Sequence, residues 1–488
     1  MLIAYVIAIF VIYLTIQWLV HRAKNYPPGP PSIPFLGNIV FIPSKNIHFT
    51  LAGKWRQKYG PLVGLTVGSS LRAVAVCGPR EVLEILKREE FQGRPKGEFF
   101  KERSFNKYLG VFFSDGPFWL EQRRFTLRHL RDFGFGKKSM GDIIAEEVED
   151  AIQEMSRNVT FQANGMFAIS TLNVLWGMIA GTRYARDDAQ LKPILQRLKK
   201  VFRSGNPSGG IIQAFPILKR IIPGLIGHTA QMQNLQEMQS MFRSSIKEHE
   251  KTIDRNNPRD LTDAYLREMN LQKLNPNTTF TEEGLITICL DLFIAGGETT
   301  TSSIEFSLMY MILYPEVQKA VQKELDAVVG QNRRPTLEDR PNLPYVEAVI
   351  HELLRVCSIA PIAPPHRATE DAYVNGYFIP KETMLIICIY SLMQDKEHWG
   401  DPENFRPERF LNSEGQFVKD EWMLPFGTGK RMCLGEVLAR STVYLFFTSL
   451  LQEFTFSLPE GEPKPSTIPL SGFTIAPQPF RVKVTKRN

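Results

Sequence analysis

The stretch from Thr279 to Tyr314 constrains the fold of this chain more than any other. Its apolar residues follow a helical pattern without a proline, which predicts a helix of unusual length for a globular protein. Thr279 and Glu282 match a capping box, so we expect the helix to begin there. Gly296 and Gly297 stand near its middle, where each glycine costs about 1 kcal/mol relative to alanine. Two such residues need a reason, so they indicate a functional segment.

Strand signals gather in three short places, and nearly everything between them reads as helix. Residues 62–76 alternate around a Gly-Ser-Ser turn, and residues 372–379 place an Asn-Gly pair between two apolar runs. The third place is 473–484. Neither a repeat nor a low-complexity stretch interrupts the 488 residues, whose 43% hydrophobic content is ordinary for a folded chain. The sequence predicts a mainly α protein with a smaller β-rich part.

The first twenty residues read as a membrane anchor. Residues 2–20 are nineteen uncharged positions, long enough to cross a bilayer as a helix. No basic segment precedes them and no small-x-small site follows, which argues against a cleaved signal peptide. Positive charges and a stiff proline run come next, which keeps the rest of the chain cytosolic. We expect an anchor over 1–20, a basic and proline-rich hinge over 21–38, and a globular part over 39–488.

Charge and cysteine content argue against a nucleic-acid-binding protein and against a protein held together by disulfides. The net charge of +7 is dispersed, without a basic run with interleaved aromatics, so nucleic acid is not expected as a partner. An acidic protein or anionic lipid fits this charge better. The five cysteines are odd in number and widely spaced, which predicts no disulfides. Four of them are expected to be small buried residues: Cys77, Cys289, Cys357 and Cys388.

The fifth cysteine, Cys433, lies in a glycine-rich run. Gly427, Gly429 and Gly435 permit positive φ and a close approach of backbone N–H groups to a thiolate. The apolar pattern from Leu434 onward predicts a helix, which places Cys433 at a helix N-terminus. There the dipole and free N–H groups favour the thiolate. Taken alone, the run would equally suit a buried cysteine in a glycine-rich loop.

The full run Phe426-Gly427-Thr428-Gly429-Lys430-Arg431-Met432-Cys433-Leu434-Gly435 resembles the haem-binding motif of the cytochrome P450 family. Further stretches in the family's order extend the resemblance over nearly all of the chain. It implies the cytochrome P450 fold, a large helical domain plus a small sheet domain, behind one N-terminal transmembrane helix. It also implies haem b with Cys433 as the axial thiolate ligand of the iron, which makes 39–488 a haem-thiolate catalytic domain.

Two further motifs follow from the resemblance. Glu352 and Arg355 match the family's Glu-x-x-Arg pair, and Arg409 matches its partner arginine. These three are expected to form a structural scaffold, although the pair read alone is a surface ion pair. Glu298 and Thr299 match the acid–alcohol pair that relays protons for oxygen activation. Thr299 is also expected to donate to the carbonyl of Ala295 and bend the helix.

The resemblance also assigns the surroundings of the cofactor. Residues expected to hold the haem propionates are Arg94, Trp119, Arg123, His366 and Arg431, with Arg367 as a substitute for His366. Residues expected to line the substrate pocket are Phe113, Ala295, Ala360, Pro364 and Phe473.

These features predict a monooxygenase that inserts one atom of O2 into a lipophilic substrate. The chain shows no flavin or nicotinamide motif, so its electrons are expected from NADPH–cytochrome P450 reductase, with cytochrome b5 as a second partner. The implied location is the endoplasmic reticulum membrane. A candidate docking surface, which would equally suit a merely solvated face, consists of Arg123, Arg124, Arg128, Arg131, Lys137, Lys138 and Lys430.

The substrate and the reaction class leave alternatives open. The chain is similar to microsomal drug- and hormone-metabolising members, and most of all to insect ones. This points to epoxidation of a sesquiterpenoid ester such as methyl farnesoate, as in juvenile hormone synthesis, or to hydroxylation of steroid hormones or foreign compounds. A haem-thiolate isomerase or lyase and a non-catalytic haem-binding protein are the alternatives from other classes. The Glu298–Thr299 pair argues against the isomerase or lyase.

Overall fold

The computed structural model describes Tyr5, Ile12 and residues 25–43, 45–68, 71–189, 191–204 and 210–487. Apart from Tyr5 and Ile12, the predicted anchor over 1–20 lies outside these described residues, and so do residues 21–24 of the predicted hinge. Within the described part of the chain, none of the helices combines the length and the apolar character needed to span a membrane.

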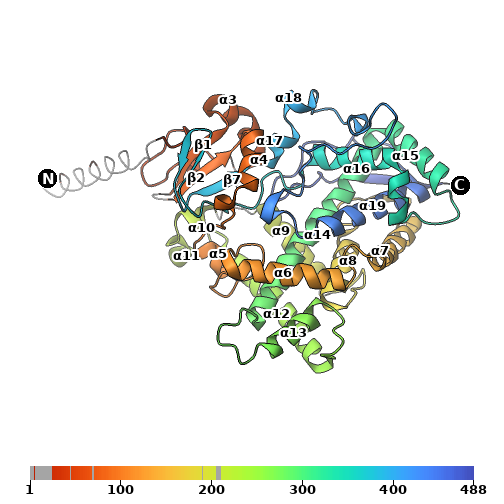
Figure 1. The fold of residues 1–488 in the computed structure, drawn as a ribbon. Helices are drawn as coiled ribbons and strands as arrows, with labels where there is room; N and C mark the ends of the chain where they lie inside the picture. Colours follow the sequence, from red (N-terminus) through yellow and green to blue (C-terminus); the bar gives the residue numbers. More distant parts are fainter. Residues whose placement is uncertain are drawn as a thin grey trace.

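The largest sheet has four strands in the order β1-β2-β7-β4. The pairs β1/β2 and β4/β7 are antiparallel, whereas β2 and β7 run parallel. The predicted hairpin over 62–76 is therefore confirmed, and Figure 1 shows this sheet at the left side of the molecule. The strand bounds are β1 Leu62–Val67, β2 Leu71–Val76, β4 His366–Arg367 and β7 Met384–Ile387.

Two smaller sheets complete the β part. The Asn-Gly hairpin is confirmed, with Asn375 and Gly376 at φ angles of 47° and 76° between its strands. The C-terminal strand begins at Arg481, later than predicted, because residues 470–476 make only an isolated bridge. The strands are β5 Ala372–Val374 and β6 Tyr377–Ile379 in one sheet, and β3 Thr160–Gln162, β9 Arg481–Lys486 and β8 Phe454–Ser457 in the other.

Helices make up most of the remaining structure, which confirms a mainly α protein with a small sheet part. The helices of the first half are α2 Ile47–Thr50, α3 Arg56–Tyr59, α4 Pro79–Lys87, α5 Glu98–Glu102, α6 Gly116–Asp132, α7 Lys138–Arg157, α8 Ala168–Ala180, α9 Leu191–Ser204, α10 Gly210–Ala214 and α11 Leu218–Ile221. Those of the second half are α12 His228–Thr252, α13 Leu261–Leu271, α14 Glu282–Leu313, α15 Pro315–Val328, α16 Pro344–Cys357, α17 Ile389–Met393, α18 Lys396–Trp399 and α19 Glu436–Glu453.

Single turns join these elements. The 3-10 turns are η1 Ile39–Phe41, η3 Glu89–Phe91, η4 Leu337–Asn342, η5 Pro407–Phe410 and η6 Gly429–Arg431, and the π-turn is η2 Leu51–Trp55.

The long helix predicted from the sequence is α14, and it runs through the centre of the helical part (Figure 1). It has 32 residues and packs against α8, α12, α16 and α19. Its start differs from the prediction, because Thr281 and not Thr279 caps it and accepts a hydrogen bond from Gly284 N–H at 3.1 Å. The Thr279 hydroxyl instead donates to Glu121 of α6 at 2.5 Å. A helix apolar on nearly all sides is a buried one, so α14 organises the core.

Candidate functional site

Cys433 lies in a tight loop that precedes α19. Its N–H donates to the carbonyl of Phe426 at 2.9 Å, which closes the loop. Gly427 and Gly429 have φ angles of 70° and 75°, as predicted, and a Cβ on Gly429 would lie 2.3 Å from the carbonyl oxygen of Leu86. Gly435 has a φ of −93°, so it does not use the positive φ that glycine permits, but its N–H approaches the Cys433 sulfur.

The Cys433 thiol is flanked by protein but uncovered on one side. Its side chain is exposed, whereas the other four cysteines are buried as predicted. Burial nevertheless raises the pKa of the thiol, and the Gly435 N–H directed at the sulfur lowers it. Helix α19 begins at Glu436 with Gly435 as its N-cap, so Cys433 precedes the predicted helix by three residues. A cation on the uncovered side would be needed to hold this thiol as a thiolate.

Three arginines converge near this loop beside His366, and we call Arg94, Arg123 and Arg431 the cation cluster. Arg94 donates to the carbonyls of Phe112, Pro364 and Pro365 at 2.8 to 3.0 Å, and Arg123 donates to Met432 O at 2.6 Å. Arg431 donates to Gln92 O at 2.9 Å, and its guanidinium lies 3.7 Å from the centre of the Trp119 ring.

Positive charge in the cation cluster is only partly offset, by the nearby carboxylates of Asp115 and Asp291. Within the described ranges, none of its three arginines forms an ion pair with a carboxylate, and the Nη1 of Arg431 is buried without a partner. Burial lowers the pKa of Arg94 to about 9, with repulsion from Arg123 adding to the effect. Burial and repulsion from Arg94 lower the pKa of Arg431 to about 8, and burial holds that of His366 well below its usual value. Such a cluster is suited to receive an anionic group.

Trp119, and Arg367 as the predicted substitute for His366, have their polar groups engaged within the protein. The indole N–H of Trp119 donates to Val111 O at 3.1 Å. Arg367 pairs with Asp115 at 2.8 Å and also with Glu382, so its charge is already neutralised. His366 donates from Nδ1 to Phe91 O at 2.8 Å, and because burial keeps the ring neutral, its Nε2 is left as an acceptor. His366 would therefore bond a carboxylate through Nε2 only after gaining a proton, whereas the charge of Arg367 is already neutralised within the protein.

The predicted acid–alcohol pair lies on α14. The Thr299 hydroxyl donates to Ala295 O at 2.8 Å, which is the predicted back-bond. Ala295 is exposed although it lies in the middle of a largely buried helix. Glu298 makes an ion pair with Arg203 of α9, a contact that the sequence did not reveal because its two members are far apart in the chain.

One of the two helix glycines has a packing role. A Cβ on Gly296 would lie 2.4 Å from a methyl carbon of Leu175 on α8, whereas a Cβ on Gly297 would meet nothing closer than 3.9 Å. Gly296 therefore lets α8 approach α14 closely, which accounts for part of the glycine signal in the sequence.

Phenylalanines gather beside this part of α14. The ring centre of Phe112 lies 4.7 Å from that of Phe113 and 6.2 Å from that of Phe473, which lies 6.0 Å from Phe202. We call these four side chains the aromatic group. The predicted pocket residues differ in exposure: Phe113 is buried, Ala360, Pro364 and Phe473 are half-buried, and Ala295 is exposed.

Asp291 on α14 holds the segment that leads into the aromatic group. Its buried carboxylate accepts hydrogen bonds from the N–H groups of Val111 and Phe112 at 2.7 and 3.0 Å. It also pairs with Arg103 at 2.5 Å, and a Cβ on Gly110 would lie 2.3 Å from one of its oxygens. The sequence carried no signal for this contact, since a single Asp in an apolar helix does not specify its partner.

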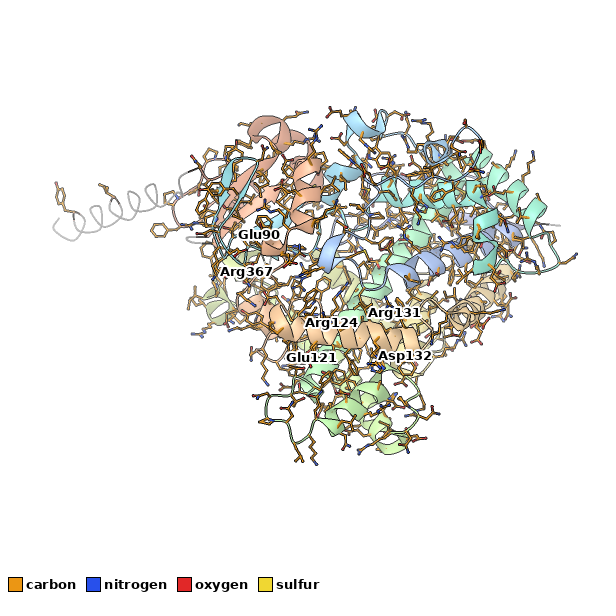
Figure 2. The ribbon with its side chains drawn as sticks, viewed as in Figure 1. Glu90, Glu121, Arg124, Arg131, Asp132 and Arg367 are labelled. Atoms are coloured by element: carbon orange, nitrogen blue, oxygen red, sulfur yellow. The ribbon has the colours of Figure 1, made fainter. Side chains whose placement is uncertain are left out.

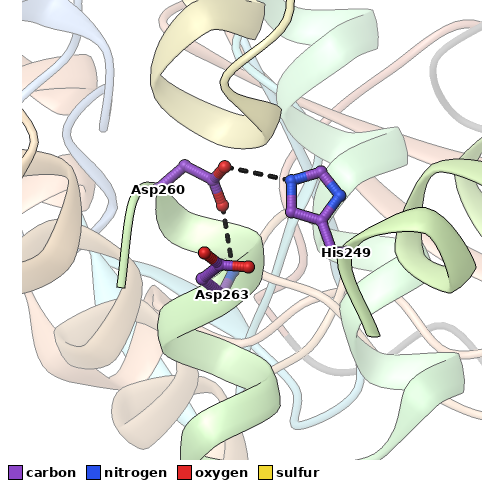
Figure 3. Close-up of side chains that lie close together, drawn as sticks. All are labelled: His249, Asp260 and Asp263. Atoms are coloured by element: carbon purple, nitrogen blue, oxygen red, sulfur yellow. Dashed lines mark hydrogen bonds and ion pairs between the residues drawn. The ribbon is translucent and has the colours of Figure 1, made fainter. Parts of the chain in front are cut away.

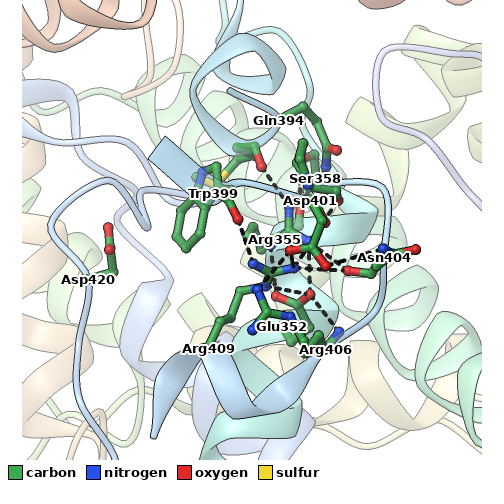
Figure 4. Close-up of polar contacts among 12 residues, drawn as sticks. Glu352, Arg355, Ser358, Gln394, Trp399, Asp401, Asn404, Arg406, Arg409 and Asp420 are labelled. Carbon is green, nitrogen blue, oxygen red and sulfur yellow. Dashed lines mark hydrogen bonds and ion pairs between the residues drawn. The ribbon is translucent and has the colours of Figure 1, made fainter. Parts of the chain in front are cut away.

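The predicted trio of Glu352, Arg355 and Arg409 forms a closed buried network (Figure 4). Arg355 binds the Glu352 carboxylate through two hydrogen bonds at 2.7 and 2.8 Å, and Arg409 adds one at 3.0 Å. Arg406 N–H donates to the same carboxylate, and Arg355 donates to Met393 O. Glu352 and Arg355 are fully buried, so the reading as a surface pair is wrong. The network ties α16 to the chain around η5.

Part of the predicted docking surface is a row of unpaired charges on α6. Arg124, Arg128 and Arg131 are exposed and follow each other at helical spacing, and in the described part of the chain none has an ion-pair partner. Figure 2 places Arg124 and Arg131 along this helix. By contrast, Lys138 and Lys430 lie 3.7 and 2.5 Å from glutamates.

A loop cysteine beside unbalanced buried cations, under a long central helix, is the arrangement of a haem-thiolate protein. The family model of cytochrome P450 matches residues 27–484, and the chain belongs to the cytochrome P450 family. Farnesoate epoxidase of Bombyx mori is 38% identical over 99% of this chain and 98% of its own. Cytochrome P450 2D20 of Mesocricetus auratus is 38% identical over 96% of each chain, and cytochrome P450 2J2 of Homo sapiens is 38% identical over 94% and 91%.

Membership makes the chain a P450 monooxygenase, an oxidoreductase with haem b, an axial thiolate and electrons from NADPH through a reductase. Its substrates are lipophilic small molecules. The cation cluster fits this cofactor, because two propionate groups would balance its charge and supply a partner for the buried Nη1 of Arg431.

Proposed function

We propose that this monooxygenase epoxidises a sesquiterpenoid ester such as methyl farnesoate. The observation that carries the proposal is the near full-length similarity to a protein named farnesoate epoxidase. The aromatic group supports it, since four neighbouring phenylalanines suit a long apolar chain better than a charged substrate.

In this proposal Cys433 is the iron ligand, and Arg94, Arg123, His366 and Arg431 hold the propionates. Haem bound through a thiolate supplies the oxygen-activating chemistry, in which the cysteine donates electron density. Trp119 contributes its ring under the Arg431 guanidinium, because its own N–H is engaged with backbone.

The distal residues then handle protons and substrate. Glu298 accepts and passes a proton, and the Thr299 hydroxyl, held by Ala295 O, orients the delivery. The proposed wall of the substrate pocket consists of Phe113, Ala295, Ala360, Pro364 and Phe473.

Electrons enter, in our proposal, through the basic side of the molecule. The unpaired arginines of α6 offer charge to an acidic partner, which is NADPH–cytochrome P450 reductase and, as a second donor, cytochrome b5. Residues 1–20 anchor the enzyme in the endoplasmic reticulum membrane as a single span, with 21–38 as the hinge and 39–488 as the cytosolic catalytic domain.

Reconstitution with reductase and NADPH tests the function. We expect methyl farnesoate to shift the haem spectrum and to yield an epoxide identified by mass spectrometry, whereas a steroid panel gives less product. Cys433→Ser should abolish the thiolate spectrum of the reduced CO complex, and Cys357→Ala, at a buried cysteine of α16, should keep it. NADPH-dependent product from steroids alone would refute the substrate.

A further inference from the structure

Arg203 is a half-buried arginine near the end of α9, and it joins two parts of the proposed site. Its Nη2 forms the ion pair with Glu298 of α14. Its Nη1 donates to the carbonyl oxygens of Leu470 and Thr474 at 3.2 and 2.8 Å. One guanidinium therefore binds both the acid of the predicted acid–alcohol pair and a segment near the C-terminus.

That segment, residues 470–476, carries Phe473 of the aromatic group, and we call it the wall loop. An isolated bridge between its two ends, with hydrogen bonds of 2.8 and 3.3 Å, closes the loop on itself. Phe473 N–H donates to the carbonyl of Phe202 on α9 at 2.9 Å. A Cβ on Gly472 would lie 2.4 Å from the same carbonyl oxygen, so the loop lies directly against the helix. Two consecutive residues of α9, Phe202 and Arg203, thus hold the wall loop.

The ion pair between Arg203 and Glu298 is selective. In the described part of the chain, each of the two has the other as its one ion-pair partner. The two buried acids of α14 have other partners, because Asp291 pairs with Arg103 and Glu305 accepts from a backbone N–H. The Glu298 side chain is only 13% exposed, so its position depends on this one cation.

We propose that Arg203 is a positioning residue that fixes Glu298 and the wall loop relative to each other. A substrate that fits beside Phe473 leaves the wall loop in place, so Arg203 keeps Glu298 where it passes a proton. A substrate that displaces Phe473 moves the guanidinium through its two carbonyl contacts, and Glu298 moves with it. Small displacements of a positioned group cost much of its catalytic effect, so proton delivery depends on the fit of the substrate. The inference rests on the proposed roles of Glu298 and Phe473.

The test compares Arg203→Met with the unaltered full-length holoenzyme, reconstituted with reductase and NADPH. Methionine has no donor, so Glu298 and the wall loop both lose their contacts with this side chain. With methyl farnesoate we expect the coupling, defined as product formed per NADPH consumed, to fall several-fold at an unchanged haem spectrum. Deuterium exchange of a peptide covering 470–476, measured by mass spectrometry, should become several-fold faster, because the loop is held less firmly against α9.

Arg197→Met is the matched control. Arg197 lies on the same helix and pairs with Glu237 of α12, so this variant also removes one ion pair between α9 and another helix. Among the described residues, Arg197 has no ion pair with Glu298 and no hydrogen bond with the wall loop. This variant should therefore keep both the coupling and the exchange rate of the unaltered enzyme.

Arg203→Lys separates the two contacts. A single ammonium still pairs with Glu298, but it lacks the planar fork that reaches a carboxylate and two carbonyls together. We expect the coupling to recover in part, while exchange of the wall loop stays fast. This variant carries the test if Arg203→Met does not hold haem, and loop exchange at the original rate in it would overturn the inference.

The outcomes separate the inference from the proposed function. Unchanged coupling in both Arg203 variants overturns the inference, and epoxide formed by the unaltered enzyme then leaves the function standing. If the unaltered enzyme forms no epoxide from methyl farnesoate, the proposed substrate fails, and the same comparison with a substrate that it does oxidise decides the inference. If Glu298→Gln couples normally, the proposed role of Glu298 fails, and the inference fails with it.

Discussion

Two buried groups of charged side chains, the network around Glu352 and the cation cluster, differ in how their charges are paired. Around Glu352 every charge has its partner: Arg355 and Arg409 both bind the Glu352 carboxylate, Arg409 also pairs with Asp401, and their other donors bind carbonyls. In the cation cluster, Arg94 and Arg431 meet only carbonyls and an aromatic ring, and a buried donor is left over. The first group is complete within the protein, and the second becomes complete with an anion.

This difference distinguishes buried charges that stabilise the fold from buried charges that bind a ligand. Burying a charge costs several kcal/mol unless a partner compensates it. In a balanced network, partners within the protein compensate the cost of burying the charges, so the network stabilises one fixed structure. In an unbalanced network that cost is compensated only when a ligand binds, so its residues serve binding more than folding.

The largest expected effect comes from breaking the balanced network. Arg355→Ala leaves the Glu352 carboxylate buried with Arg409 alone, which should destabilise the fold by about 3–5 kcal/mol. Chemical unfolding followed by circular dichroism measures this. Arg334→Ala, which removes a half-exposed arginine paired with Glu453, should cost about 1 kcal/mol or less. Equal losses in the two variants would contradict the comparison.

Removing a charge from the cation cluster should affect ligand retention and spare the fold. Arg431→Leu deletes the charge-assisted bond that we propose to a haem propionate, worth about 1.5–3 kcal/mol, so haem should leave roughly ten to a hundred times faster. Transfer of haem to apomyoglobin measures the rate, and circular dichroism should be unchanged. Arg431→Lys keeps the charge and should recover part of the retention. Haem loss at the original rate would show that Arg431 does not hold it.

Asp291 tests whether a buried carboxylate with all its partners in the protein can also determine the position of the aromatic group. Asp291→Asn weakens its hold on Val111 and Phe112, so the aromatic group should shift and the ratio of products should change several-fold, or about 1 kcal/mol. Product analysis by mass spectrometry measures the ratio. Asp263→Asn alters a similar buried carboxylate that accepts from Arg259, outside the site, and should leave the ratio unchanged. The same ratio in both variants would make Asp291 purely structural.

The smallest expected effect concerns the pair of His249 and Asp260, whose charge balance depends on the protonation of His249. His249 donates to Ser245 O and to Asp260, close to Asp263 (Figure 3), so both its ring nitrogens carry hydrogen. Burial lowers the pKa of His249, but these bonds outweigh it and the pKa is raised above 6.5. The stabilisation is therefore full below pH 6.5 and is lost as pH rises through the raised pKa. Thermal unfolding across this range should show it, and His249→Gln should remove the pH dependence.

Sequence patterns predicted the parts of the site that short motifs encode. Gly427 and Gly429 before Cys433, the Glu352–Arg355 pair and the Thr299 back-bond all depend on neighbours within a few residues, and all three local geometries are present. Helix starts were less predictable: Thr279 matches a capping box in sequence, but its hydroxyl bonds Glu121 on another helix, and Thr281 caps α14 instead.

The sequence by itself determined the long central helix and the hairpins, since these follow from local spacing and propensity. Its motifs, through their resemblance to a known family, also determined the class of this protein and the cysteine expected to bind iron. Only the tertiary structure decided that Arg203 holds Glu298, that Asp291 clamps the aromatic segment, that Glu305 is buried, and that the cation cluster is unbalanced. Those properties depend on burial and on partners up to hundreds of residues away, and electrostatic energies in a low-dielectric interior are set by distance in space.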